Sequence, residues 1–145
     1  MGTSVPAGVG HVRDWMSREP VTASPDQQAR QVAGLMRVRG IRHVLVVEGG
    51  RLAGVVSHRD VRRLEPEAPL PADSPVALLM ADNPVTVSPD VPLTVAARAM
   101  LEHRIGALPV VEDDRVVGIL TRSDVLEALL AWAESRTADS REGGR

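Results

Sequence analysis

The chain contains two similar segments, and this internal repeat constrains its fold more than any other feature of the sequence. Residues 20–26 (PVTASPD) return as residues 84–90 (PVTVSPD), 64 positions later. The offset holds without a gap when residues 16–61 are paired with residues 80–125, and 17 of these 46 positions are identical. Such a repeat predicts two copies of one structural unit, related by a pseudo-twofold axis.

The size and composition of the chain indicate that the two copies share a core. A chain of 145 residues has room for one ordinary domain, and halves of roughly 50–60 residues would each be marginally stable alone. Phe and Tyr are absent and Trp occurs twice, so the core must be built from aliphatic side chains.

Charge and cysteine content argue against several classes of protein. The formal net charge is −2, and no basic cluster is denser than Arg59, Arg62 and Arg63, so we expect no nucleic-acid or membrane partner. Without cysteine the chain has no disulfide, thiolate nucleophile or zinc–thiolate site. No apolar run approaches the ~20 residues of a membrane span, and the N-terminus has no signal-peptide core. A cytoplasmic protein is therefore expected.

Each copy shows the pattern strand, helix, strand, strand, helix, which predicts a mixed α/β (α+β) fold. Residues 21–23 and 85–87 are short β-type runs. Ser24 and Ser88, each followed by Pro and Asp, are the predicted N-caps of the first helices. Apolar residues then recur at helical spacing, at Ala29, Val32, Ala33 and Met36 in the first copy and at Leu93, Ala96, Ala97 and Met100 in the second.

The second part of each copy predicts a strand pair and a closing helix. Val44–Val47 and Leu108–Val111 are continuous apolar runs that indicate buried strands, each followed by a tight turn and a partner strand. The closing helices are predicted to begin at Ser57 and Thr121, and the later one to run to Trp132. The expected division of the chain is a flexible N-terminus (1–10), a first repeat (11–64), a proline-rich linker (65–75), a second repeat (76–132) and a disordered tail (133–145).

Both copies end in the pattern G-x-x-[S/T]-x-x-D, where a strand gives way to a helix. The amides at a helix N-terminus favour a phosphate group, and the hydroxyl of Ser57 or Thr121 adds a donor. Asp60 and Asp124 are ionised acceptors that can bind the two hydroxyls of a ribose. The same pattern is also a variant of the capping box, in which the carboxylate accepts from the N-cap amide. Taken alone, one copy favours capping, whereas the duplicated context favours binding, and the two roles are compatible in a ligand-free protein.

With these motifs on both copies, each copy resembles a CBS domain, the small β-α-β-β-α unit named after cystathionine β-synthase. The resemblance covers about residues 12–130 and rests on 16–22 with 80–86, on the run IGALPVV at 105–111, and on the two closing motifs. It implies a Bateman module, in which two sheets pack around a pseudo-twofold axis and leave two clefts that commonly hold adenosine nucleotides. It also implies a disc-like homodimer. The first copy departs from the family pattern at 42–45 (RHVL), where the second has GALP.

The resemblance also implies which residues would bind the ligand. Backbone and side chains at His43–Val44 and Ala107–Leu108, with Thr22 and Thr86, would hold the base, and the Asp residues would bind the ribose. The full set of expected binding residues is Thr22, His43, Val44, Ser57, His58, Arg59, Asp60, Thr86, Ala107, Leu108, Thr121, Arg122 and Asp124. In the alignment of the two copies, His43 is equivalent to Ala107, and His58–Arg59 is equivalent to Arg122–Ser123. The two clefts are therefore expected to differ in charge and in affinity.

Three functions remain open from the sequence. The first is a regulatory module that binds AMP, ADP or ATP, with S-adenosylmethionine and NAD less favoured, and that modulates an unknown effector protein. The second is a ligand-free dimerisation or interaction module in which the closing motifs only cap helices. The third is a small enzyme, which no nucleophile–base pair, phosphate loop or metal cluster supports; the four histidines have no ligand spacing, so neither catalytic nor metal-binding residues are expected.

Overall fold

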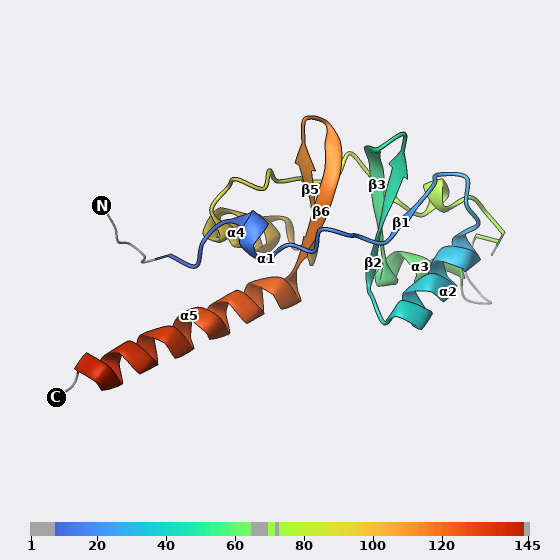
Figure 1. The fold of residues 1–145 in the computed structure, drawn as a ribbon. Coiled ribbons are helices and arrows are strands. Elements are labelled where there is room, and N and C mark those ends of the chain that lie inside the picture. The colour runs from blue at the N-terminus through green and yellow to red at the C-terminus, as the bar shows by residue number, and fades with distance from the viewer. Residues whose placement is uncertain (1–7, 65–69, 72, 144–145) are drawn as a thin grey trace.

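The two copies form two lobes whose β-sheets face each other, with helices on the outer side of each sheet (Figure 1). The computed structural model describes residues 8–64, 70, 71 and 73–143, so much of the expected flexible N-terminus and of the proline-rich linker lies outside the described residues. The mixed α+β class is confirmed.

The elements alternate as the repeat predicts, with a short helical lead-in before each copy. In chain order they are α1 (Val12–Trp15), β1 (Thr22–Ala23), α2 (Ala29–Arg39), β2 (His43–Glu48), β3 (Arg51–Ser57), α3 (His58–Val61), the 3₁₀ helices Arg62–Leu64 and Val76–Leu78, β4 (Ala81–Asp82), α4 (Leu93–His103), β5 (Ala107–Glu112), β6 (Arg115–Thr121) and α5 (Arg122–Gly143).

The two sheets share one pairing scheme. In the first sheet, with strand order β1-β2-β3-β4, β1 is parallel to β2 and the other neighbours are antiparallel. The second sheet has β5 paired with β6, and isolated bridges complete it: Val87 lies parallel to β5 at Val110, and Ser17 lies antiparallel to β6 at Ile119. These bridges repeat the pairs Ala23–Val46 and Val55–Ala81 of the first sheet at an offset of 64 residues. The run 85–87 is therefore a single bridge rather than the predicted strand.

The lead-in of each copy packs on the other copy (Figure 1). The N–H of Val12 in α1 donates to the carbonyl of Val91 at 3.0 Å, and Val12 and Met16 are buried in the second repeat's core. In the same way, Val76 is fully buried in the first repeat's core, and β4 extends the first sheet. The chain thus crosses between the lobes twice. The first lobe contains the consecutive elements β1 to β4, whereas the second lobe combines α1 with the elements from α4 to α5.

Glycines permit this crossing, because the lead-ins run tightly over the sheets. A Cβ on Gly54 would lie 2.7 Å from the carbonyl oxygen of Ala81, and a Cβ on Gly118 would lie 2.6 Å from that of Ser17. Both distances are shorter than side-chain carbons tolerate, so only glycine fits at these two equivalent positions.

Three apolar clusters hold the molecule together. One core lies in each lobe, with Val32 and Met36 of α2 in the first and Leu93, Ala96 and Met100 of α4 in the second, as the helical spacing predicts. A third cluster of Leu45, Ala107 and Ile119 joins the two sheets face to face. This shared cluster accounts for the stability of two units that would each be small alone.

The first helices begin later than predicted. Ser24 and Ser88 are not N-caps: α2 follows Gln28 and α4 follows Pro92. Instead, the side chain of Ser24 donates to Asp26 at 2.9 Å and that of Ser88 accepts from the N–H of Asp90 at 3.1 Å. Serine hydroxyls compete for nearby groups in this way, and here they stabilise a turn before the helix.

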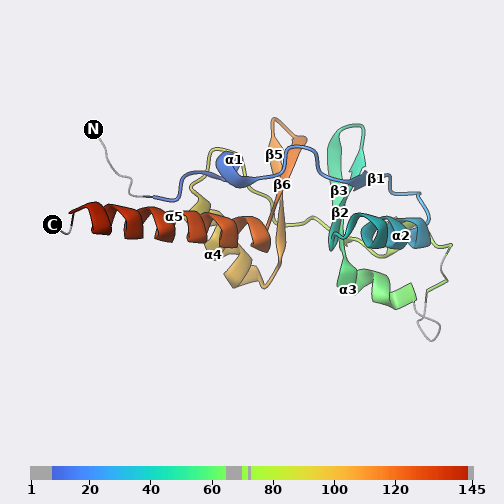
Figure 2. The same cartoon turned by 60° about the horizontal axis from the view of Figure 1, so that its bottom comes forward.

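The expected disordered tail is also corrected, because α5 continues to Gly143. The segment after Trp132 contains alanine, glutamate and arginine, which are strong helix formers. The guanidinium of Arg136 lies 5.1 Å from the centre of the Trp132 ring, one turn away, and adds a cation–π contact. In both views of the fold this helix projects away from the lobes (Figures 1 and 2).

Candidate functional site between the two repeats

The first closing motif forms a complete capping box, and the second makes the matching bond from the N-cap amide to the carboxylate at the equivalent place in the other lobe. In the first, the N–H of Ser57 donates to Oδ2 of Asp60 at 2.8 Å, and the hydroxyl of Ser57 accepts from the N–H of Asp60 at 3.2 Å. In the second, the N–H of Thr121 donates to Oδ2 of Asp124 at 2.8 Å. The capping interpretation therefore describes this ligand-free arrangement. Both carboxylates are only half-buried, so they can still turn towards a ligand.

The starts of β2 and β5 bring further expected residues next to these motifs. His43 pairs with Ser57 in the sheet register, and Ala107 pairs with Thr121. His43 lies two residues from Leu45, which packs between the sheets, so its side chain is on the face directed at the other lobe.

The side chains of Val44 and Leu108 lie on the opposite faces of these strands. Both are fully buried, Val44 in the core of the first lobe and Leu108 in that of the second. The expectation that these two side chains hold a base is therefore corrected, because both side chains are directed into the cores.

Charged groups from both lobes converge around His43. A Cβ on Gly106 would lie 3.4 Å from Cζ of Arg122 and 3.5 Å from Cε1 of His43, so these three residues of different lobes are neighbours. Burial lowers the pKa of His43 below its ordinary 6.5, the positive charges of Arg122 and Arg42 lower it further, and Asp60 opposes them. The surroundings of His43 are thus cationic on balance. His43 lies near both Asp60 of the first closing motif and Arg122, the first residue of α5.

The backbone ties these groups to the starts of the closing helices. The N–H of His58 donates to the carbonyl of Arg42 at 2.7 Å, and the N–H of Arg122 donates to that of Gly106 at 3.1 Å. Arg42 and Arg122 are exposed, and among the residues that the structure describes neither makes an ion pair within 4.0 Å. Two free guanidinium groups beside a helix start are suited to binding an anion such as a phosphate.

The remaining expected residues all have exposed side chains. His58 and Arg59 are exposed in the single turn of α3, and Thr22 is exposed on β1, opposite Leu45. Thr86 lines a separate cleft near the hairpin turns.

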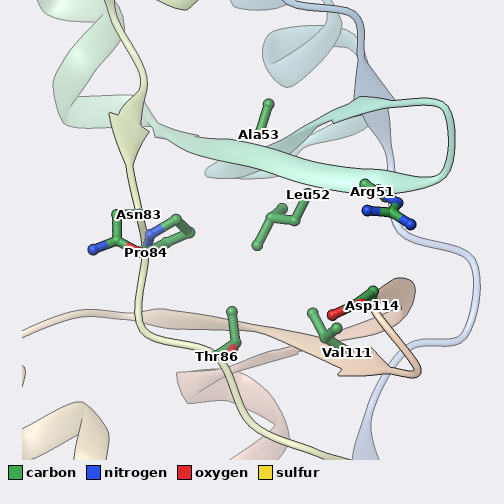
Figure 3. Close-up of a pocket in the computed structure, with 8 residues that line it drawn as sticks. All are labelled: Arg51, Leu52, Ala53, Asn83, Pro84, Thr86, Val111 and Asp114. Atoms are coloured by element: carbon green, nitrogen blue, oxygen red, sulfur yellow. The ribbon is translucent and has the colours of Figure 1, made fainter.

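This second cleft lies between the lobes and has a volume of about 370 Å³ (Figure 3). Three segments line it: β3 of the first repeat, the stretch that follows β4, and the β5–β6 hairpin of the second repeat. Its lining residues are Arg51, Leu52, Ala53, Asn83, Pro84, Thr86, Val111 and Asp114. Apart from Thr86, none of them belongs to a motif that the sequence analysis identified. A weaker signal was available, because Asn83 pairs with Glu19 and Asp114 with Gly50 in the alignment of the two copies.

Two other kinds of feature are absent from the part of the chain that the structure describes. No three His, Cys, Asp or Glu side chains there are grouped closely enough to hold a metal ion. No helix there is both long and apolar enough to span a bilayer.

Comparison with known proteins agrees with this architecture. The family model for the CBS domain matches residues 12–67 and again residues 76–131. The CBS domain-containing protein YhcV of Bacillus subtilis is 31% identical over 114 residues, covering 79% of this chain and 81% of that protein. Inosine-5′-monophosphate dehydrogenase of Korarchaeum cryptofilum is 32% identical over 118 residues, but the match spans only 24% of that enzyme.

Two solved structures show the same fold with ligands. CBSX2 in complex with AMP superposes with a TM-score of 0.77 at 28% identity, covering 86% of this chain and 98% of that one. The CBS domain pair of MJ0100, in complex with 5′-methylthioadenosine and S-adenosyl-L-methionine, has a TM-score of 0.75 at 27% identity, covering 83% of this chain and 96% of that one. The chain therefore belongs to the CBS-domain family and carries two CBS domains in tandem.

Proposed function

We propose that this protein is a regulatory module that binds an adenosine nucleotide of the AMP, ADP or ATP class between its two CBS repeats. The observation that carries the proposal is the meeting of His43, Arg122 and Gly106 from opposite lobes, beside the Ser57–Asp60 motif. Similar CBS pairs bind adenosine compounds, among them AMP and S-adenosylmethionine, which supports the same ligand class for this chain.

Each group has a role that follows from its chemistry. Arg42 and Arg122 would neutralise the phosphate, and the amides at the start of α3 or α5 would donate to it. Asp60 or Asp124 would leave its capping bond and accept from the ribose hydroxyls. Gly106 places no side chain between Arg122 and His43.

Binding would change how the lobes pack, because the anion would hold cationic groups of both lobes together. Arg122 and Arg42 are close enough to the partly buried His43 to lower its pKa, so cationic groups of both lobes already face one another. A ligand that prefers one arrangement of the lobes shifts the population towards it. An effector protein or a second copy in a homodimer would sense this shift.

A second candidate, a ligand-free interaction module, is favoured by one observation. The α5 helix exposes large apolar side chains, with Leu126 and Leu130 each 58% exposed and Leu129 50% exposed. Such a surface is typical of a contact with another protein. In this case the closing motifs would act as helix caps alone, and nucleotides would have no effect.

Thermal melting with a panel of nucleotides tests the proposal. A ligand at 100 times its Kd stabilises the folded state by about 2.7 kcal/mol per site, so AMP, ADP or ATP should raise the melting temperature. Arg122→Gln should weaken the response, because it removes the phosphate-neutralising charge and leaves the Thr121–Asp124 cap intact. Arg98→Gln, an exposed arginine on α4, is the matched control. The absence of a shift with every adenosine compound at millimolar concentration would overturn the proposal in favour of the interaction module.

A further inference from the structure

We infer that the cleft near the hairpin turns is a second binding site, separate from the proposed nucleotide site, and that it takes a free α-amino acid. Its walls come from both repeats and from the segment that crosses between them (Figure 3). The inference rests on three features of this cleft: two unpaired opposite charges at one end, the apolar walls, and the polar groups at the other end.

The charged end is formed by Arg51 of β3 and Asp114 of the β5–β6 turn. Figure 3 shows both side chains at the same end of the cleft. They do not form an ion pair with each other within 4.0 Å, and Glu48, opposite Arg51 in the hairpin register, does not pair with Arg51 either. Arg115, the next residue after Asp114, lies against Gly50. One cation and one anion thus lie at the same end of the cleft without forming an ion pair.

An α-amino acid presents the complementary pair of charges on a single carbon. Its carboxylate can accept two parallel hydrogen bonds from the guanidinium of Arg51, and its ammonium group can donate to the carboxylate of Asp114. The ligand would complete the ion pairing that the two side chains lack. A nucleotide phosphate does not suit this end, because Asp114 would repel it.

The rest of the cleft suits an amino-acid side chain with an aliphatic stem and a polar end. Leu52 and Val111 point into the space between the two hairpins, and Asn83 and Thr86 lie further from the charged end (Figure 3). The volume of about 370 Å³ falls in the range of about 300–1,000 Å³ that small-molecule sites occupy.

The cleft has a pseudo-symmetric counterpart on the other face of the molecule, but the charged residues of the two faces differ. On the equivalent positions of the other face, arginine, proline and threonine recur as Arg115, Pro20 and Thr22. Asp114 is replaced there by Gly50, however, and Asn83 by Glu19. The ammonium-binding carboxylate at the turn is therefore missing from the equivalent face, and we expect one amino-acid site per chain.

Isothermal titration calorimetry of the full chain with L-amino acids tests the inference. Glutamine and methionine are the first probes, because each has an aliphatic stem and a polarisable or polar end. N-acetylglutamine lacks the ammonium charge and glutaminamide lacks the carboxylate. We expect each of these analogues to bind about fivefold more weakly, the loss that one exposed ion pair accounts for. Failure of every L-amino acid to bind at millimolar concentration, or equal binding of the blocked analogues, would overturn the inference.

Two variants of neighbouring residues distinguish the loss of the Asp114 charge from a general change in the β5–β6 turn. Asp114→Asn removes the charge and keeps a residue that tolerates the positive φ of 65° at this position, and it should weaken amino-acid binding about fivefold. Asp113→Asn, in the same turn with a φ of 52°, is outside the lining of the cleft and should bind as the unmodified chain does.

Arg122→Gln separates this inference from the proposed function. It should reduce the nucleotide response and leave amino-acid binding unchanged. Likewise, the affinity for the amino acid should be nearly the same in the presence and absence of saturating AMP. Displacement of the amino acid by AMP would show that the cleft belongs to the nucleotide site and would overturn the inference of a separate one.

Discussion

The two repeats begin their closing helices in the same way and end them very differently. Ser57 and Thr121 donate to the following Asp at the same distance, 2.8 Å. Nevertheless α3 has four residues, whereas α5 has 22. The sequence after α3 reaches Pro66, which lacks the N–H that a helix interior needs, and α5 continues into alanine-rich sequence. The repeated motif thus determines where a helix starts, and the unrepeated residues that follow determine its length.

A substitution at the two crossing glycines should have the largest effect, and it should be similar in both lobes. Gly54→Ala and Gly118→Ala each place a methyl group against a backbone carbonyl of the lead-in from the other repeat. We expect each to lower the free energy of unfolding by about 1–3 kcal/mol, the usual cost of overpacking. Urea denaturation measures this loss. Gly34→Ala in α2, where a Cβ meets only the end of the Arg37 side chain at 3.9 Å, is the control and should not destabilise the fold.

Removing the caps should distinguish the lobes. Asp60→Ala and Asp124→Ala each remove a capping acceptor, and a cap contributes about 0.5–2 kcal/mol. The effect should be larger for Asp124, because α5 buries Ala128 in the second core, whereas none of the four residues of α3 is buried. Urea midpoints of the two variants test the order. An equal loss in both variants would mean that the stability contributed by a cap does not depend on whether its helix packs in the core.

The start of β2 should give the first lobe a pH dependence that the second does not have. The pKa of His43 is lowered in the folded protein, so between that lowered value and 6.5 the unfolded chain binds more protons than the folded one. Stability should therefore fall as the pH decreases through this window and remain unaffected by His43 above it. Ala107 occupies the equivalent place in the second lobe and cannot titrate.

Urea midpoints between about pH 8 and pH 5 measure this dependence. His43→Ala should flatten the profile in the window below 6.5. The exposed His103 at the end of α4 provides the control, since His103→Ala should retain the slope. A slope that survives in His43→Ala would assign the proton uptake to another group.

The smallest effect on stability is expected from the part of α5 that projects beyond the lobes. No side chain from Leu129 to Ala138 is buried. Ser135→Pro should break this part of the helix and reduce the helical signal in far-ultraviolet circular dichroism. The urea midpoint should remain that of the unmodified chain, because the broken segment is not packed in the core. A clear drop in the midpoint would show that the projecting helix contributes to folding.

The features that the sequence predicted are those that depend on periodicity or on the repeat itself. The apolar spacing located Val32, Met36 and Met100 in the cores, and the two closing motifs located the helix starts at Ser57 and Thr121. These signals are local, so they survive in a single sequence.

The features that the sequence did not predict depend on competition between local groups or on contacts distant in the chain. Ser24 has the composition of an N-cap, but its hydroxyl bonds to Asp26 and the helix starts later. The crossing of the lead-ins, and the cleft that joins Arg51 to Asp114, bring together residues that no local pattern relates. For His43, the position on β2 was predictable from the sequence, but the proximity to Arg122 was not.

The exchanged lead-ins also bear on how such a chain can be divided. A fragment that stopped between the copies would keep α1, which belongs to the other half's core, and would lack Val76 and β4, which complete its own. Such a fragment could fill its gap by borrowing the matching segment from another molecule. Joining two copies in one polypeptide makes that exchange intramolecular, at an effective concentration of the order of millimolar for a short connection. Tandem duplication is thus a means by which a unit that is incomplete alone becomes a self-sufficient fold.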